Sequence, residues 1–205
     1  MTGRGVFINC PFSDDYREHF RAIVFGVIRS GFTARCAREN NDGAEVRIDK
    51  ICRIIAECGY GIHDISKTEP DASTGLPRFN MPLELGLFIG ARRFDSGKQK
   101  TKKALILDAE RYRYQDFISD IAGQDIQAHG GDIDRLIDHV ATWLRDQTPD
   151  PDAPGGDAIA EEYSRFAADP PAICADKSLK SDKITFKDLS LLAANWIVAE
   201  SASPT

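Results

Sequence analysis

Glu84 is the residue of this chain whose type and surroundings point most directly to chemistry. It is the only charged side chain in the run from Phe79 to Ala91. Asn80 suits a helix cap and Pro82 suits a first helical position, which places Glu84 in the first turn of an apolar helix. Such helices are usually buried, and a buried carboxylate is costly unless it is paired or used. A poorly solvated, ionised carboxylate at a pocket mouth is what cleavage of a glycosidic bond needs.

A structural role for Glu84 is the alternative, because the positive end of the helix dipole stabilises any acidic residue in a first turn. The same dipole is expected to favour the ionised carboxylate. A capping box fits poorly, since with Asn80 as the cap the reciprocal position is Leu83. The sequence therefore leaves both a catalytic role and a helix-stabilising role open for Glu84.

Other candidate site residues lie in three segments of the chain. Asp64 closes an expected strand, where its carboxylate could accept hydrogen bonds from a ribose hydroxyl or cap the following loop. Asn9 and Phe12 follow the first expected strand; Asn9 could bind a polar ligand atom, and Phe12 could stack on a base or pack in the core. Arg78 could hold a phosphate or stand in solvent. Asn80, a cap by the reasoning above, completes the candidate substrate-binding set.

An alternation of strands and helices positions these candidates. Short apolar runs predict five strands, over residues 6–10, 32–37, 60–65, 104–107 and 126–128. Besides the helix that carries Glu84, spacing and stop signals predict helices over residues 14–30, 44–58, 112–121 and 132–146. This pattern indicates an α/β domain with a central parallel sheet of about five strands and helices on both faces. Because ligands bind beyond the carboxyl ends of such strands, the candidates are expected along one edge.

Residues 148–156 are rich in proline and glycine and are interpreted as a linker. They separate a domain of residues 1–147 from a C-terminal helical appendage of residues 157–205. The appendage is expected to form two helices, near residues 157–168 and 185–200. Because two helices in about 50 residues are marginal as an independent unit, we expect them to dock on the domain or to form a surface for a protein partner.

Composition argues against several classes of protein. The 205 residues carry a formal net charge of -6, with a pI near 5.3, which argues against a broad nucleic-acid surface. No run approaches the roughly 20 apolar residues that cross a bilayer, and no signal-peptide pattern is present, so a cytoplasmic protein without membrane contact is expected.

The cysteines and histidines do not suggest a metal site. The five cysteines form no Cys-x-x-Cys pair, and we interpret them as reduced, mostly buried thiols. The four histidines form no His-Glu-x-x-His pattern, so neither a metal ion nor a cofactor is expected. His63, in the middle of an expected strand, is interpreted as a core histidine rather than a base.

Three features in order resemble a known group of proteins. These are Val-Phe-Ile-Asn-Cys-Pro-Phe at 6–12, Asp64 at a strand end, and Asn-Met-Pro-Leu-Glu-Leu-Gly at 80–86. Together they resemble the nucleoside deoxyribosyltransferase-like group and the related bacterial Toll/interleukin-receptor (TIR)-like proteins, over roughly residues 5–147. The resemblance implies a flavodoxin-like, three-layer fold.

The resemblance also implies roles for two residues. In the deoxyribosyltransferase-like group, a Glu-Leu-Gly at a helix start carries the nucleophilic glutamate, and an upstream strand-end aspartate assists; Glu84 and Asp64 match those positions. In catalytic TIR domains, a glutamate early in the corresponding helix supports cleavage of the nicotinamide–ribose bond of NAD. The implied function is a nucleotide N-glycosidase that hydrolyses NAD as a substrate, acts as a homo-oligomer and serves in antiphage defence.

Two alternatives stay open. One is a non-catalytic nucleotide-sensing or TIR-like assembly module, with the C-terminal helices available to a protein partner. The other is a nucleoside deoxyribosyltransferase. The second is less favoured, because Pro-Arg-Phe-Asn-Met-Pro at 77–82 stands where those enzymes have a glycine-rich approach to the glutamate.

Overall fold

The computed structural model describes residues 3–39, 42–70, 74–148, 150, 153–168 and 183–202. Five strands form one sheet in the order β2-β1-β3-β4-β5. The strands are β1 (Gly5–Asn9), β2 (Thr33–Cys36), β3 (Tyr60–Asp64), β4 (Lys103–Asp108) and β5 (Ile126–Ala128). Every pairing between neighbours is parallel. This is the flavodoxin-like, doubly wound order, and it confirms the expected fold class.

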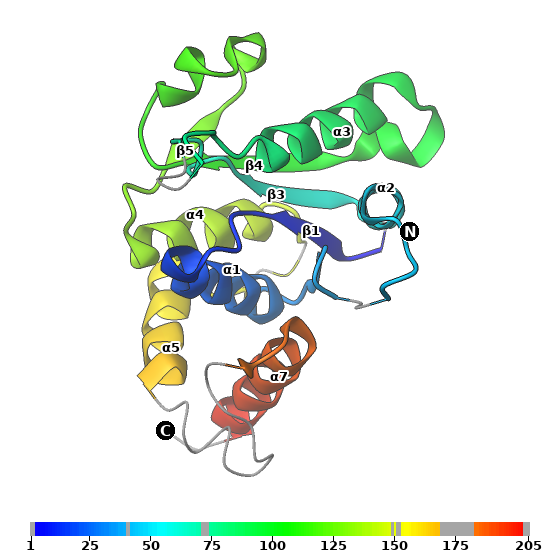
Figure 1. The fold of residues 1–205 in the computed structure, drawn as a ribbon. Coiled ribbons are helices and arrows are strands. Elements are labelled where there is room, and N and C mark those ends of the chain that lie inside the picture. Colours follow the sequence, from blue (N-terminus) through cyan, green and yellow to red (C-terminus); the bar gives the residue numbers. More distant parts are fainter. Residues whose placement is uncertain are drawn as a thin grey trace.

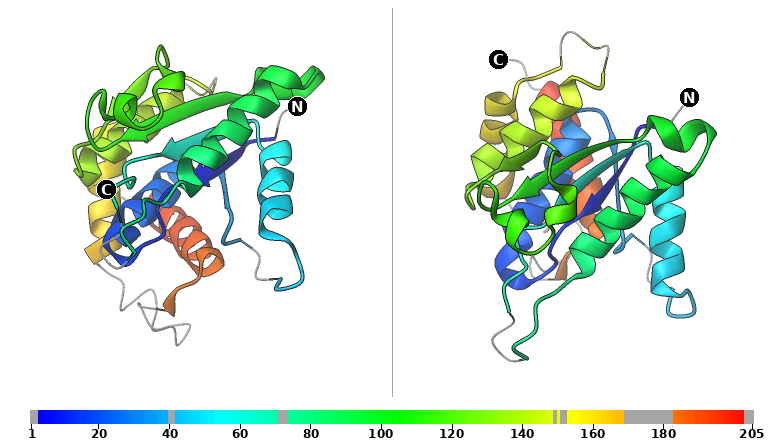
Figure 2. Two further views of the ribbon diagram at one scale, coloured as in Figure 1. Left: turned by 45° about the horizontal axis from the view of Figure 1, so that its top comes forward. Right: turned by 90° about the horizontal axis from the view of Figure 1, so that it is seen from above.

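Helices cover both faces of this sheet (Figures 1 and 2). The domain contains α1 (Arg17–Arg29), α2 (Arg47–Glu57), α3 (Asn80–Phe94) and α4 (Ile133–Arg145). Helices α1 and α4 pack together on one face, whereas α2 and α3 pack together on the other. A short 3-10 turn, Asp14–Tyr16, leads into α1.

The strand β1, which lies between β2 and β3, is buried on both faces, as its unbroken apolar run predicts. Val6 and Ile8 belong to the core under α1 and α4. Phe7 points the other way, into the core that includes Phe88 of α3. Successive side chains of a β-strand point to opposite faces of the sheet, which explains this alternation. Because both faces of β1 are covered, only the residues at its end can contact solvent or a ligand.

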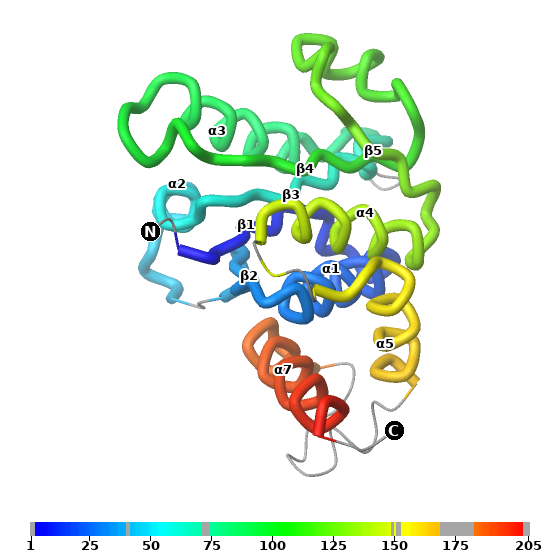
Figure 3. The backbone as a smooth tube through the Cα atoms, turned by 180° about the vertical axis from the view of Figure 1, so that it is seen from behind, coloured from blue at the N-terminus to red at the C-terminus, as the bar shows by residue number. Residues whose placement is uncertain are grey.

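The C-terminal helices α5 (Gly156–Ala168) and α7 (Phe186–Ala202) lie beyond α1, on the side away from the sheet (Figures 1 and 3). The Phe25 ring of α1 lies 5.1 Å from the Phe166 ring and 5.7 Å from that of Trp196. The buried apolar side chains of both helices belong to the same core as Val6. The expected docking is therefore confirmed. Residues 149, 151–152, 169–182 and 203–205, parts of the expected linker and appendage, lie outside the described residues.

Two expectations about helices are wrong. Residues 112–121 form no α-helix; they make two short 3-10 turns, Arg113–Asp116 and Ser119–Ile121. Tyr112 has a φ of 66°, a left-handed conformation that stops a helix from starting there. In addition, α2 begins at Arg47 rather than at residue 44, because Val46 is extended and caps it. Val46 is consequently 60% exposed.

Two further observations concern the free cysteines and the length of the helices. Cys10, Cys36 and Cys58 are buried free thiols and Cys52 is an exposed one, while Cys174 lies outside the described residues. Among the helices that the structure describes, none combines the length and apolar character needed to span a membrane.

Candidate functional site

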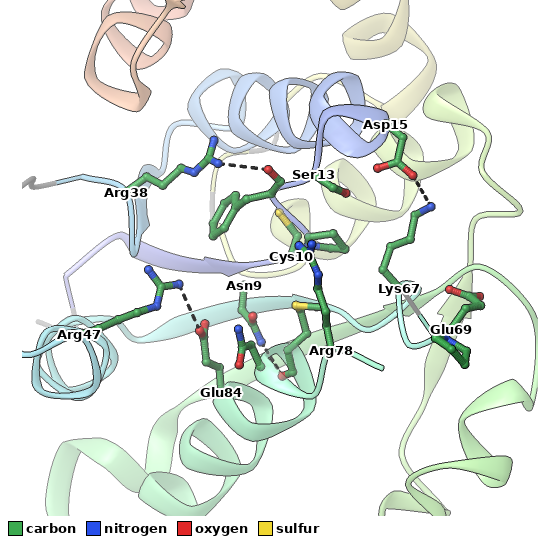
Figure 4. A pocket seen from close by; sticks show the side chains of 15 residues that line it. Asn9, Cys10, Ser13, Asp15, Arg38, Arg47, Lys67, Glu69, Arg78 and Glu84 are labelled. Atoms are coloured by element: carbon green, nitrogen blue, oxygen red, sulfur yellow. Dashed lines mark hydrogen bonds and ion pairs between the residues drawn. The ribbon is translucent and has the colours of Figure 1, made fainter. Parts of the chain in front are cut away.

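A pocket of about 550 Å³ lies beyond the carboxyl ends of β1 and β3, where the strand order reverses (Figure 4). We call it the Glu84 pocket. Five of the predicted site residues line it, namely Asn9, Phe12, Arg78, Asn80 and Glu84. The sixth, Asp64, does not line it. Sheets of this order bind ligands at such a switch point, and the pocket lies at the sheet edge where the sequence analysis placed the candidate residues.

The Glu84 side chain points into this pocket, and Arg47 stands across from it (Figure 4). Glu84 is only 5% exposed. One oxygen, Oε1, lies 3.9 Å from the Arg47 guanidinium. None of the hydrogen bonds found among the described residues reaches this carboxylate. Glu84 is therefore a buried acid whose oxygens are available to a ligand.

The start of α3 differs from the expected one. Phe79 occupies the cap position, Asn80 is the first helical residue, and Pro82 is the third. Glu84 is thus the fifth residue of α3, outside the first turn. The dipole weakens beyond that turn, so it does not set the charge of Glu84.

Burial raises the pKa of Glu84 to about 7, and the nearby Arg47 opposes this rise only in part. Removing a carboxylate from water disfavours its charged form, which explains the direction. The expectation that the ionised form is favoured is therefore wrong. Near neutral pH the group exists in both protonation states, which suits an acid or base that takes part in a reaction.

Asn9 fixes the start of α3. Its side-chain amide donates to the Met81 carbonyl at 2.9 Å and to His63 Nδ1 at 3.1 Å. Both amide hydrogens are used, so only its carbonyl oxygen remains for a ligand. His63 is fully buried, and burial, assisted by the charge of Lys102, lowers its pKa to about 3. His63 is a neutral core histidine, as expected.

Phe12 is half-buried and serves both the pocket and the core. Its ring meets the Phe20 ring edge-on at 5.2 Å. The Arg38 guanidinium lies 4.5 Å from the Phe12 ring centre and donates to the Phe12 carbonyl at 3.1 Å. Phe12 therefore packs partly against the core, which was one of its two alternatives, and its ring also lines the pocket. Stacking of the ring on a base stays a prediction.

Asp64 is fully buried and forms the centre of a polar network behind the pocket. It accepts hydrogen bonds from the Tyr16 hydroxyl at 2.5 Å and from the Ser66 amide at 2.9 Å, and from the Ser66 hydroxyl. His129 Nε2 lies 3.1 Å from Asp64 Oδ2, the oxygen that also accepts from Tyr16. Burial raises the pKa of Asp64, but the contacts with His129, Ser66 and Tyr16 together outweigh it and lower the pKa. Asp64 therefore caps its loop, the second of its two predicted roles.

The charged residues of the pocket favour an anion. Four cations and three carboxylates line it: Arg38, Arg47, Lys67, Arg78, Asp15, Glu69 and Glu84. Lys67 pairs with Asp15 at 2.5 Å, and Glu69 pairs with Arg113 at 3.0 Å. With Glu84 partly protonated, the local balance is positive in a chain of net charge -6. Such a local field attracts negatively charged ligands.

Sequence reasoning did not identify Arg47 or Lys67 as site residues. Arg47 follows Val46, which occupies the cap position of α2, and Lys67 follows Ser66, which donates to the loop-capping Asp64. Each is a charged residue close to a strand end or a helix start at the edge of the sheet where ligands were expected. Their position in the sequence could therefore have identified both as candidates. Within the part of the chain that is described, no cluster of His, Cys, Asp or Glu suited to a metal ion occurs.

Fold and pocket together define a flavodoxin-like α/β protein with a buried carboxylate in its strand-end pocket. Comparisons with protein-family models, curated proteins and solved structures found no match. The argument about function therefore depends on the geometry of the Glu84 pocket.

Proposed function

We propose that this protein cleaves the N-glycosidic bond of a nucleotide, most directly the nicotinamide–ribose bond of NAD. The observation that carries the proposal is the position of Glu84. The residue is 5% exposed, and its carboxylate points into a cation-rich pocket of about 550 Å³ and accepts none of the hydrogen bonds found among the described residues. The resemblance to the TIR-like and deoxyribosyltransferase-like proteins supports the same assignment.

In the proposed reaction, the ionised Glu84 carboxylate faces the anomeric carbon and attacks it or stabilises an oxocarbenium-like transition state. The carbon–nitrogen bond breaks, and its electron pair leaves with nicotinamide, which departs as a neutral base and requires no proton. Water then supplies the hydroxyl group on the anomeric carbon and releases one proton. The products are ADP-ribose, nicotinamide and a proton.

Other residues of the pocket have supporting roles in this proposal. Arg78 and Arg47 line the wall and suit the phosphate groups of a nucleotide, because guanidinium groups bind phosphate oxygens in pairs. The exposed part of the Phe12 ring offers a surface for the base. Asn9 acts through α3, which it holds by the Met81 carbonyl. Asp64 holds the loop that follows β3.

One observation favours a second candidate, a non-catalytic nucleotide-sensing module. In the deoxyribosyltransferase-like arrangement an aspartate assists the glutamate, but here Asp64 is enclosed and does not line the pocket. The same observation weakens the proposal of a deoxyribosyltransferase. A sensor requires the anion-binding wall of the pocket and makes no use of the protonation state of Glu84.

An assay of base release separates these functions. Purified protein is incubated with NAD and, separately, with deoxynucleosides, and free base is followed by chromatography. Release of nicotinamide from NAD supports the glycosidase. Binding of ADP-ribose by calorimetry without any base release, at high protein concentration, would instead establish the sensor.

A further inference from the structure

A second pocket, of about 250 Å³, lies between α1, the loop that follows β1 and the start of α7. We call it the arginine pocket, because Arg17, Arg21 and Arg38 line it. It shares Phe12, Ser13 and Arg38 with the Glu84 pocket, so the two cavities are separated by a common wall. The helix α7 of the C-terminal appendage therefore lines a cavity that adjoins the Glu84 pocket.

Two of the three arginines are presented by one face of α1. Arg17 and Arg21 are four residues apart, a spacing that places both side chains on the same side of a helix. Arg17 pairs with Asp14 and Arg21 with Glu18, each three residues away. Exposed pairs of this kind contribute little to stability, so a stronger anion can replace the carboxylate.

Arg38 has no carboxylate partner among the described residues. Its guanidinium donates to the Phe12 carbonyl at 3.1 Å and lies over the face of the Phe12 ring. The remaining donors of the guanidinium stay available at the common wall. Three cations with one lining carboxylate, Asp14, therefore give this pocket a positive charge.

The opposite side of the arginine pocket is apolar. Phe186, at the start of α7, contacts Phe20 of α1 with ring centres 6.1 Å apart. Ile184 and Leu189 extend this wall. A cavity with guanidinium groups on one side and apolar side chains on the other fits an anion that carries an organic group.

We propose that the arginine pocket binds a small organic phosphate. The phosphate group contacts the three arginines, whose guanidinium groups match phosphate oxygens in pairs. The organic group packs on the apolar wall that α7 completes. Because Arg38 and Phe12 belong to both pockets, a ligand here also fixes one wall of the Glu84 pocket and so acts as an effector of it.

The test uses the full chain, labelled with ¹⁵N, and phenyl phosphate as the probe. Amide signals are followed by NMR during a titration. The expected result is a saturable shift of the amides at Arg17–Arg21 and at Ile184–Leu189. Arg21→Gln and Arg17→Gln should each weaken binding about tenfold, the loss expected for one charge-assisted hydrogen bond. Arg165→Gln, which removes an exposed arginine paired with Glu200, is the matched control and should bind like the wild type.

The location of the probe decides the result independently of any enzyme activity. If the shifts concentrate at residues 80–84 and binding is lost in Arg47→Gln but kept in Arg21→Gln, the phosphate occupies the Glu84 pocket and the proposal is wrong. Equal affinity in wild type, Arg17→Gln and Arg21→Gln overturns it as well. A thermal melt of each variant establishes that the protein is folded before its affinity is compared.

Discussion

The Arg47 guanidinium lies 3.9 Å from Glu84 Oε1 and links the first residue of α2 to the fifth residue of α3. The two side chains differ in environment, since that of Arg47 is 59% exposed and that of Glu84 only 7%. The solvated cation therefore lowers the pKa of Glu84 less than burial raises it. This imbalance gives Glu84 a pKa of about 7 and leads to the first two predictions.

The rate of base release should rise with pH through about 7 and then level off, because the proposed reaction uses the ionised form of Glu84. Arg47→Gln removes the cation that lowers this pKa, so the rise should move to higher pH. Arg47→Lys retains the charge and should keep most of the wild-type profile. The measurement is kcat/KM from pH 5 to 9. A rate that falls across this range contradicts the proposed role of the carboxylate.

Glu84→Gln should stabilise the folded protein at pH 8. The folded pKa of Glu84 is raised, so the native state binds more protons than the unfolded state between about pH 4.5 and 7, and stability falls as pH rises through that window. The neutral amide avoids this loss. The expected gain is about 1–3 kcal/mol at pH 8 and close to zero at pH 4.5. Denaturant unfolding at both pH values measures this gain. If Glu84→Gln is no more stable than the wild type at pH 8, the proposed cost of burying the Glu84 charge is wrong.

Asp64→Asn should have the opposite effect. The new amide group places N–H donors against the Tyr16 hydroxyl or His129, so hydrogen bonds of a buried charge are lost, at a cost of about 2–4 kcal/mol at pH 7. Because the folded pKa of Asp64 is lowered, its contribution is present above the unfolded pKa and is lost as pH falls below about 3.8. Denaturant unfolding should therefore show that the difference in free energy of unfolding between wild type and variant becomes smaller as the pH falls into the acid range. A small difference in the free energy of unfolding that does not change with pH would contradict a stabilising role for the hydrogen-bond network around Asp64.

Asn9→Ala should loosen the start of α3. It leaves the Met81 carbonyl and His63 Nδ1 without their donor, which costs about 1–3 kcal/mol of stability. If Asn9 positions Glu84, kcat should fall more than KM rises, whereas loss of a substrate contact would raise KM. Steady-state kinetics and denaturant unfolding of the same preparation distinguish the two. Wild-type kinetics in a variant that has lost this stability would show that Asn9 has no positioning role.

The sheet could be predicted because its signals are local. The run Val6–Ile8 is continuous and apolar, and alternation of strands with helices fixes a parallel order. The start of α3 was placed less well from the sequence. Its cap is Phe79, a residue type that helix capping does not favour, and the first turn is held by a hydrogen bond from the distant Asn9 to the Met81 carbonyl. The enclosure of Asp64 depends on Tyr16 and His129, which are distant in sequence. Five of the six candidate residues line one pocket because strand ends converge at one edge of the sheet. The contacts of Asp64 depend on neighbours that sequence spacing does not reveal.

The central claim is that the Glu84 carboxylate cleaves a nucleotide N-glycosidic bond, and one comparison tests it most directly. Initial rates of nicotinamide release from NAD are measured at pH 8 for wild type and Glu84→Gln, after unfolding curves have shown that both are fully folded. The account predicts measurable release by the wild type and a loss of at least about 100-fold in the variant, equivalent to roughly 3 kcal/mol of transition-state stabilisation. Equal rates in the two folded proteins, or no release by the wild type at high concentration, would contradict it.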